Sequence, residues 1–185
     1  MPMRGWASES EVQGVKLVRW CDNYAMGVNN LTYSKEGLQL TEYFEGDVLH
    51  AYQDQRGIWT IGYGHTAGVH PGMTITQEQA EAFLAGDVRT AVTCVNQVVT
   101  VKLTQPQFDS LVDFVFNVGA TNFRTSTLLR DINAGNFPDA IAQFNLWNHC
   151  GGVVNQGLLR RRQAEAAKFS EETPPEPSGG SGVAS

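Results

Sequence analysis

The stretch from Glu45 to Thr66 constrains the fold more strongly than any other part of this 185-residue chain. Just before it, apolar side chains recur at mostly helical spacing: Leu38, Leu40, Tyr43 and Phe44. This pattern predicts a short helix that ends at Glu45. Ser34, a side chain that favours helix N-caps, indicates where the helix begins. The glutamate is therefore expected at the boundary between a helix and the element that follows it.

A β-hairpin is predicted directly after this helix. Asp54 precedes a turn of Gln, Arg and Gly, and the residues from Ile58 to Ile61 are β-branched or aromatic. Gly62 and Gly64 bracket Tyr63, which indicates a bend where the backbone approaches another element. A helix end that faces a small sheet forms a cleft. Such a cleft can keep one carboxyl group dry and another in contact with water, which is what acid-catalysed cleavage of a glycoside requires.

The composition fits one globular domain, or one domain of two lobes, because 42% of the residues are hydrophobic. The formal net charge is −6, and the basic residues cluster only at Arg160, Arg161 and Arg162. Nucleic-acid-binding domains carry a basic stripe or patch. We therefore expect no nucleic-acid partner, and no general electrostatic attraction to anionic cell-wall polymers.

Helices are predicted to dominate the remainder of the chain. Thr76 begins a capping-box pattern and opens a helix of about 20 residues, which Gly86 weakens by about 1 kcal/mol relative to alanine. Thr104 begins another helix, with one apolar stripe formed by Phe108, Leu111, Val112, Val115 and Phe116. Shorter helices are predicted at 125–134, 138–147 and 158–170.

The two ends of the chain differ from its middle. In residues 1–33, valines recur every third position, and this spacing fits either a short amphipathic helix or a strand. The same segment has no uninterrupted apolar run, so we expect neither a signal peptide nor stable membrane insertion. Residues 173–185 are mostly Pro, Gly and Ser, a composition that predicts disorder.

Three blocks of residues carry a resemblance to a known family. The first is Glu45, Asp54 and Thr60, in which Thr60 begins the run TIGYGHT. The second is FVFNVG at 114–119, followed by FRTSTLL at 123–129. The third comprises Trp147, Gly151-Gly152, GLLRRR at 157–162, and Glu165. Together, in this order and over roughly residues 34–170, they resemble the phage-type lysozymes, which are the endolysins of glycoside hydrolase family 24.

The resemblance implies a fold and an activity. The fold is α+β and lysozyme-like, with a small β-hairpin or sheet lobe and a larger helical lobe joined by a long helix. The implied organisation is an N-terminal extension at 1–33, a lysozyme-like catalytic domain at 34–172 and a disordered tail at 173–185. The implied activity is hydrolysis of the β-1,4 bond between N-acetylmuramic acid and N-acetylglucosamine in bacterial peptidoglycan, which lyses the host cell.

The resemblance also assigns catalytic roles. Glu45 is the expected general acid, in a partly dry position that raises its pKa. Asp54 is the expected ionised partner that orients or activates water, and the Thr60 hydroxyl contacts the same water, so that the configuration is inverted. Each residue also has a structural interpretation: a solvated glutamate at a helix end, a turn aspartate and a strand threonine. For the aspartate and the threonine, the structural and catalytic interpretations are compatible.

Three further residues match family positions that contact the glycan. Phe116 and Ser126 match residues that line the groove, although Phe116 also fits the core stripe of its helix. Gln143 lies where relatives can carry an asparagine that touches sugar, and the difference leaves that contact open. For the run Arg160–Arg162, we favour solvated charge that caps the last helix for at least two of the arginines over contact with acidic peptide stems.

Histidine and cysteine patterns argue against a metal. His65 is interpreted as a structural residue beside the cleft, hydrogen-bonded to a carboxylate, and no ligand spacing surrounds it, so neither a metal nor a cofactor is expected. The three cysteines, Cys21, Cys94 and Cys150, are widely spaced and favour free thiols. Because some relatives use an N-terminal cysteine switch, the alternative is a regulatory disulfide, first of all between Cys21 and Cys150.

The resemblance finally implies partners and a place of action. The expected partner is a peptidoglycan glycan strand, and the enzyme is expected to be a monomer. It would be made in the host cytoplasm and act on the periplasmic wall after release, which a separate holin would permit. Two rival functions are a lytic transglycosylase, which needs an acid but no water-activating pair, and a non-catalytic wall-binding protein. The presence of Glu45, Asp54 and Thr60 favours hydrolysis over both.

Overall fold

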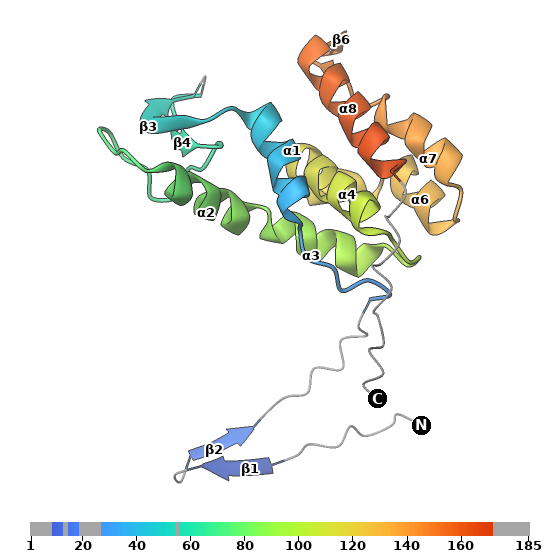
Figure 1. The fold of residues 1–185 in the computed structure, drawn as a ribbon, viewed down its shortest axis with the longest axis horizontal. Coiled ribbons are helices and arrows are strands. Elements are labelled where there is room, and N and C mark those ends of the chain that lie inside the picture. Colours follow the sequence, from blue (N-terminus) through green and yellow to red (C-terminus); the bar gives the residue numbers. More distant parts are fainter. Residues whose placement is uncertain (1–8, 13–14, 19–26, 55, 172–185) are drawn as a thin grey trace, which may run out of the picture.

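The computed structural model describes residues 9–12, 15–18, 27–54 and 56–171 of the chain (Figure 1). The helices in this part are α1 (Lys35–Glu45), α2 (Gln77–Asp87), α3 (Arg89–Val98), α4 (Gln105–Val118), α5 (Ala120–Arg124), α6 (Thr127–Asn133), α7 (Phe137–Phe144) and α8 (Gln156–Phe169). The strands are β1 (Glu9–Val12), β2 (Val15–Val18), β3 (Val48–Gln53), β4 (Trp59–Gly62), β5 (His149–Cys150) and β6 (Val153–Val154). The strands pair as three antiparallel hairpins, and the predicted α+β class is confirmed.

Helix α4 forms the centre of the helical lobe, with α1, α3 and α8 packed against it (Figure 1). The predicted stripe is buried at Phe108, Leu111, Val112 and Val115, whereas Phe116 is only half-buried. Phe114 is also fully buried, where its ring makes edge contacts with Phe123, Phe144 and Trp147. Helix α4 is therefore buried on most of its surface, as expected for a helix with a predominantly apolar sequence.

The predicted helix starts are confirmed by side-chain caps. The hydroxyl of Ser34 accepts a hydrogen bond from the Gly37 backbone at the start of α1. Thr76 and Thr104 each complete a full capping box, at the start of α2 and of α4. These side chains satisfy backbone N–H groups that have no partner inside the helix, and so they fix where each helix begins.

The predicted single long helix is wrong, because the structure interrupts it at Val88. The backbone N–H of Val88 bonds to the carbonyls of both Leu84 and Gly86, and the ψ angle of Val88 is −11°. A regular helix has ψ near about −42°, so this residue tightens the turn and divides the element into α2 and α3. Gly86, which weakens the helix in the sequence prediction, lies two residues before the break.

The predicted short helices correspond to α6, α7 and α8, with ends shifted by a few residues. The sequence patterns predict neither α5 nor the β5–β6 hairpin. Both are too short for a helical or alternating periodicity to develop, since α5 has five residues and each strand has two. In the N-terminal segment, the strand alternative holds for β1 and β2, which pair from Glu9 with Val18 to Val12 with Val15.

The β lobe is the hairpin of β3 and β4, extended on one side by a loop. Tyr52 pairs with Thr60 and Gln53 with Trp59, and the register shifts once between Val48 and Tyr52. On the other edge of β3, backbone bonds join Ala51 to Met73 and Leu49 to Ile75. Helix α2 packs against β4, whose Ile61 is fully buried. No helix in the described part of the chain is both long enough and apolar enough to cross a membrane.

Candidate active site

Glu45 is the last residue of α1, at the junction of the two lobes. Gly46 follows with φ of +71°, a conformation that L side chains rarely adopt, and it turns the chain from the helix into β3. Across the junction, a Cβ atom at Gly64 (φ +92°) would lie 3.9 Å from Glu45 Oε2. The TIGYGHT segment therefore approaches the glutamate through a residue that has no side chain.

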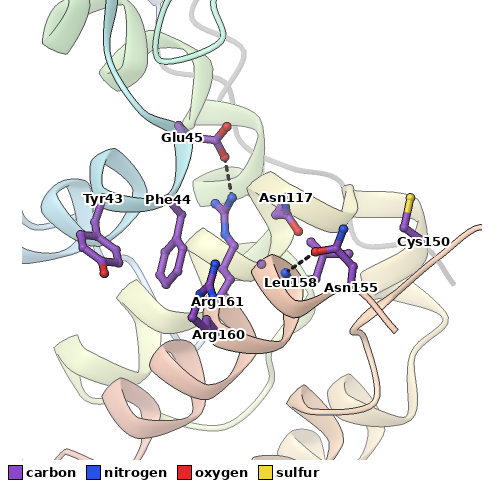
Figure 2. Close-up of a pocket in the computed structure, with 10 residues that line it drawn as sticks. Tyr43, Phe44, Glu45, Asn117, Cys150, Asn155, Leu158, Arg160 and Arg161 are labelled. Carbon is purple, nitrogen blue, oxygen red and sulfur yellow. Dashed lines mark hydrogen bonds and ion pairs between the residues drawn. The ribbon is translucent and has the colours of Figure 1, made fainter. Parts of the chain in front are cut away.

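A cleft of about 550 Å³ opens beside Glu45. Its walls come from the end of α1, from Asn117 on α4, and from the first turns of α8, and Cys150 of β5 lies at its far side (Figure 2). Tyr43 and Arg160 also line this cleft, and Tyr43 is 80% exposed. The cleft is thus lined by both polar and aromatic side chains and is open to solvent.

Arg161 connects Glu45 to the helical core. Its Nη1 donates to Glu45 Oε1 at 2.6 Å (Figure 2). Its Nε and Nη2 donate to the two carboxylate oxygens of Asp113 at 3.0 and 2.9 Å. Burial alone would lower the pKa of Arg161, but the Asp113 and Glu45 carboxylates outweigh burial and raise that pKa. The guanidinium also lies 5.6 Å from the centre of the Phe44 ring. It is therefore a permanently charged group with a fixed orientation.

Asp113 is fully buried and negatively charged. Besides Arg161, it accepts a hydrogen bond from the Thr41 hydroxyl at 2.7 Å, and Thr41 in turn bonds to the Tyr33 phenol. Burial works to raise the pKa of Asp113, but the Arg161 charge and these hydrogen bonds lower it below its ordinary value. The sequence motifs do not single out this residue. Its signal is a charged side chain within the apolar run VDFVF, because such a residue is rarely buried unless it is paired.

The neighbouring Arg162 is buried too. Its Nη2 donates to Glu165 at 2.7 Å and to Asn117 at 2.9 Å, and the guanidinium lies 4.8 Å from the Phe114 ring centre. Burial raises the pKa of Glu165 well above its ordinary value. Arg161 and Arg162 are 4% and 0% exposed. The prediction of solvated charge for at least two of the three arginines is therefore wrong, since both of these side chains turn inward toward carboxylates.

Asp54 lies in the turn that ends β3. Its Oδ1 accepts hydrogen bonds from the backbone of Arg56 and of Ile58, at 2.8 and 2.9 Å, and its Oδ2 accepts from the Arg56 guanidinium. These bonds, first of all that from Ile58, lower the pKa of Asp54 below its ordinary value. The expected turn role is confirmed, and the carboxylate is ionised.

Thr60 is buried in β4, where its hydroxyl donates to the Ile58 carbonyl at 3.0 Å. Thr60 pairs with Tyr52, and the Asp54 backbone bonds to Ile58. Asp54 directly follows β3, and Thr60 is the second residue of β4, so both lie at the turn end of the hairpin. Neither Asp54 nor Thr60 lines the cleft beside Glu45. Both belong to the hairpin that leads into Gly64, the residue that approaches Glu45.

The three residues expected to bind substrate lie in different surroundings. Phe116 is half-buried and lines a second cleft, of about 230 Å³, together with Asp87. Ser126 is buried: its hydroxyl donates to the Phe123 carbonyl and accepts from the Leu129 backbone, which caps α6. Gln143 is half-buried near the end of α7. Both hydrogen-bonding roles of the Ser126 hydroxyl are thus occupied within the protein.

His65 has the structural role that the sequence predicts. Its Nδ1 lies 2.8 Å from an oxygen of Asp87, and its Nε2 lies 2.9 Å from the Ala67 carbonyl. The ring stacks on Phe83 with 4.4 Å between centres. This residue therefore ties the loop after β4 to α2.

The two cysteines within the described residues are both free. Cys94 is buried in α3, and burial raises the pKa of its thiol. Cys150 is exposed and lines the cleft beside Glu45. Cys21, and with it the alternative of a Cys21–Cys150 disulfide, lies outside the described residues. Within residues 27–54 and 56–171, no group of three or more His, Cys, Asp or Glu side chains could hold a metal ion.

Comparisons with known proteins agree with this architecture. The phage lysozyme family model matches residues 42–165. The chain therefore belongs to the phage lysozyme family, and it is a glycosidase of the lysozyme or muramidase type.

Individual relatives cover most of the folded part. An endolysin of Acyrthosiphon pisum secondary endosymbiont phage 1 is 46% identical over 142 residues, which is 74% of this chain and 96% of that protein. A SAR-endolysin of Bacteriophage PS119 is 40% identical over 122 residues, 65% of this chain and 73% of that protein. The solved endolysin from Escherichia coli O157:H7 phage FAHEc1 is 38% identical, with a TM-score of 0.74, over 80% of this chain and 99% of that chain.

Proposed function

We propose that this enzyme hydrolyses the β-1,4 bond between N-acetylmuramic acid and N-acetylglucosamine in peptidoglycan, with Glu45 as the general acid. The observation that carries the proposal is the position of Glu45, at the junction of the lobes and beside an open polar cleft. Membership of the phage lysozyme family supports the same substrate. The side chain is 24% exposed, so it can reach a bound polymer and is still partly desolvated.

The two oxygens of the Glu45 carboxyl group have different surroundings. Oε1 accepts the hydrogen bond from Arg161, whereas Oε2 faces the backbone of Gly64. In the protonated acid, Oε1 can keep its bond to the guanidinium while the proton resides on Oε2. The proton would then pass from Oε2 to the glycosidic oxygen as the bond to the leaving sugar breaks.

The proposed partner of Glu45 is a water molecule oriented by Asp54 and Thr60. Asp54 is ionised, because three donors bind its oxygens, and an ionised carboxylate is what a water-activating base requires. Thr60 lies near Asp54, at the turn end of the same hairpin. Attack by this water on the side opposite the leaving group inverts the configuration at the anomeric carbon.

The decisive test of the acid is Glu45→Gln, because the amide has nearly the same shape but no proton to donate. We expect loss of lysis of chloroform-permeabilised Gram-negative cells with unchanged thermal stability. Glu42→Gln, on the same helix, is the matched control and should leave lysis unchanged. Activity of Glu45→Gln within a few-fold of the parent protein would reject Glu45 as the acid.

The products distinguish hydrolysis from the rival transglycosylase reaction. Hydrolysis gives fragments with reducing ends, whereas a transglycosylase gives 1,6-anhydro ends and consumes no water. Mass spectrometry of digested peptidoglycan should show reducing ends only. Proton NMR of the first product should show the α-anomer, as inversion of a β bond requires, and initial formation of the β-anomer would reject the inverting mechanism.

We also propose roles for the three residues expected to bind the glycan. Phe116 lines a cleft beside Asp87, so we propose that its exposed edge packs against a sugar ring. Gln143 is proposed to contact the glycan directly, and Ser126 to act by holding the start of α6. We propose that the enzyme acts as a monomer.

We further propose that the enzyme lyses its bacterial host and reaches the wall from the cytoplasm through a separate holin. The similarity to a SAR-endolysin keeps a holin-independent route as the alternative. Expression in Escherichia coli without any holin separates the two. Growth that continues until chloroform is added supports the holin route, and spontaneous lysis supports the alternative.

A further inference from the structure

Asp113 lies behind the pair of Arg161 and Glu45, on the side away from the cleft. It is fully buried and does not line the cleft, so it has no route to a bound glycan. Its carboxylate nevertheless receives three hydrogen bonds, two from Arg161 and one from Thr41. Burying a carboxylate is costly unless it is paired and hydrogen-bonded, and here both conditions are met.

The two hydrogen bonds that Arg161 donates to Asp113 fix the direction of its guanidinium group. Two parallel bonds to one carboxylate hold the planar group as a fork, and this leaves Nη1 aimed at Glu45 (Figure 2). Thr41 lies on α1, one helical turn before Glu45, and holds Asp113 from the other side. Helices α1, α4 and α8 are thus joined at one point, directly under the glutamate.

We propose that Asp113 is a positioning residue for glycoside hydrolysis, which holds Arg161, and through Arg161 the Glu45 carboxyl group, in place. The inference rests on the proposed role of Glu45 as the acid. Asp113 also balances the charge of Arg161. Without that balance, Arg161 would have Glu45 as its main counterion and would favour the ionised carboxylate, which cannot donate a proton.

Other charged groups near Arg161 do not replace Asp113. The charged and titratable groups that face the guanidinium are Glu45 from α1, Asp113 from α4, Glu165 and Arg162 from α8, and the Tyr33 phenol. Glu165 lies 3.5 Å away but is already bonded to Arg162, and its burial favours the protonated form. Asp113 is therefore the carboxylate that stays ionised and pairs with Arg161 through two hydrogen bonds.

The test compares Asp113→Asn with Asp109→Asn. Asp109 is also buried, one turn earlier on α4, but it bonds to Ser34 and Gln105 and to no arginine. Both variants lose a buried carboxylate, so both should be less stable. For Asp113→Asn alone we expect kcat on purified peptidoglycan to fall about 10- to 100-fold, with KM changed less than about twofold. We also expect the basic limb of its pH–rate profile to move about one pH unit toward acid.

A profile for Asp113→Asn that superimposes on that of Asp109→Asn, with the same kcat, would overturn the proposal. If Asp113→Asn does not fold, the double variant Asp113→Asn with Arg161→Met replaces it and is compared with Arg161→Met. In the double variant both charges are removed, so no unpaired ion remains in the core. Adding Asp113→Asn to Arg161→Met should change kcat less than about twofold. A further tenfold loss would show that Asp113 does not act through Arg161.

The role of Glu45 is tested separately by Glu45→Gln. An active Glu45→Gln protein would reject the proposed acid, whatever Asp113 does. An inactive Glu45→Gln protein together with an unshifted profile for Asp113→Asn would reject only the positioning role. The two failures are therefore distinguishable.

Discussion

Asn29 is predicted to hold the polypeptide upstream of α1 onto the helical lobe. Its side chain is 6% exposed, donates to the Val101 carbonyl at 2.8 Å and to the Val99 carbonyl at 3.4 Å, and accepts from the Leu103 backbone at 3.0 Å. These partners lie in the connection between α3 and α4. The neighbouring Asn30 is exposed, so Asn30→Ala is a control that changes the same residue type without these bonds.

The magnitude follows from the groups that Asn29→Ala leaves without partners. A buried backbone group that loses its partner costs about 1–3 kcal/mol. The Val101 carbonyl and the Leu103 N–H form the two short bonds and are partly buried, so we expect about 1–2 kcal/mol for each. We expect a loss of about 2–4 kcal/mol in the free energy of unfolding. For a domain of this size, that corresponds to a melting temperature lower by about 5–15 °C.

The assay is thermal unfolding followed by far-UV circular dichroism. Asn30→Ala should melt within about 1 °C of the parent protein, because surface substitutions are usually nearly neutral. Equal melting temperatures for the two alanine variants would refute the reasoning. A truncation pair extends the test: removal of residues 1–26 should leave stability and lysis intact, whereas removal of 1–29 should melt lower and still lyse permeabilised cells. We accordingly propose that the folded unit begins near residue 27 rather than at 34.

Three other predictions are tested independently. Asp54→Asn keeps an oxygen acceptor for the turn but loses the charge, so lysis should fall about 100-fold or more, whereas the control Asp47→Asn, at an exposed position, should stay active. If the Asp54→Asn protein retained most of its activity, Asp54 would have no part in the mechanism. The pKa of Glu165 is raised in the folded protein, so the free energy of unfolding should fall as pH rises from the unfolded-state pKa toward the folded-state pKa. Glu165→Gln should flatten this pH dependence of stability, and an unchanged pH dependence in that variant would contradict the prediction. Thiol reagents should modify the exposed Cys150 rapidly and the buried Cys94 only after unfolding, and all three thiols should react as free thiols in denaturant. A cross-linked Cys21–Cys150 peptide in a non-reducing peptide map, together with activity that changes on reduction, would favour the disulfide instead.

The elements next to Glu45 were predictable because local rules determine them. The spacing before Glu45 and the Ser34 cap specify α1, and a turn at Asp54 between β-forming residues specifies the hairpin. The position of His65 beside a carboxylate also follows from the first sequence block. The helix and the hairpin depend on side chains within a few residues of one another, so single-sequence patterns contain them. The partner of His65, Asp87, is 22 residues away, and only the presence of a carboxylate beside His65 was predicted.

The charged base of the site was not predictable in the same way. Asp113 occurs within an apolar stripe, and Arg161 occurs in a run of three arginines that resembles a solvated helix end. Their burial depends on partners 48 and 116 positions away in the sequence. Periodicity reports which face of a helix is apolar, but it does not report which distant carboxylate neutralises a particular arginine. The break at Val88 was missed for a related reason, since a helical pattern continues across a single tightened turn.

The same long-range pairing explains why the site should be a late product of folding. Glu45 and Arg161 come from opposite ends of the described domain, and bringing them together requires α1 and α8 to be docked on α4. Before α8 docks, Asp113 would lack its guanidinium partner, and a buried carboxylate without a partner is strongly disfavoured. The charge network therefore favours docking of α8 and, in the same step, orients the Glu45 carboxyl group. If Glu45 is the acid, as we propose, its contact with Arg161 forms only when the helical lobe is complete, so loss of α8 packing should abolish activity before it abolishes the hairpin of β3 and β4.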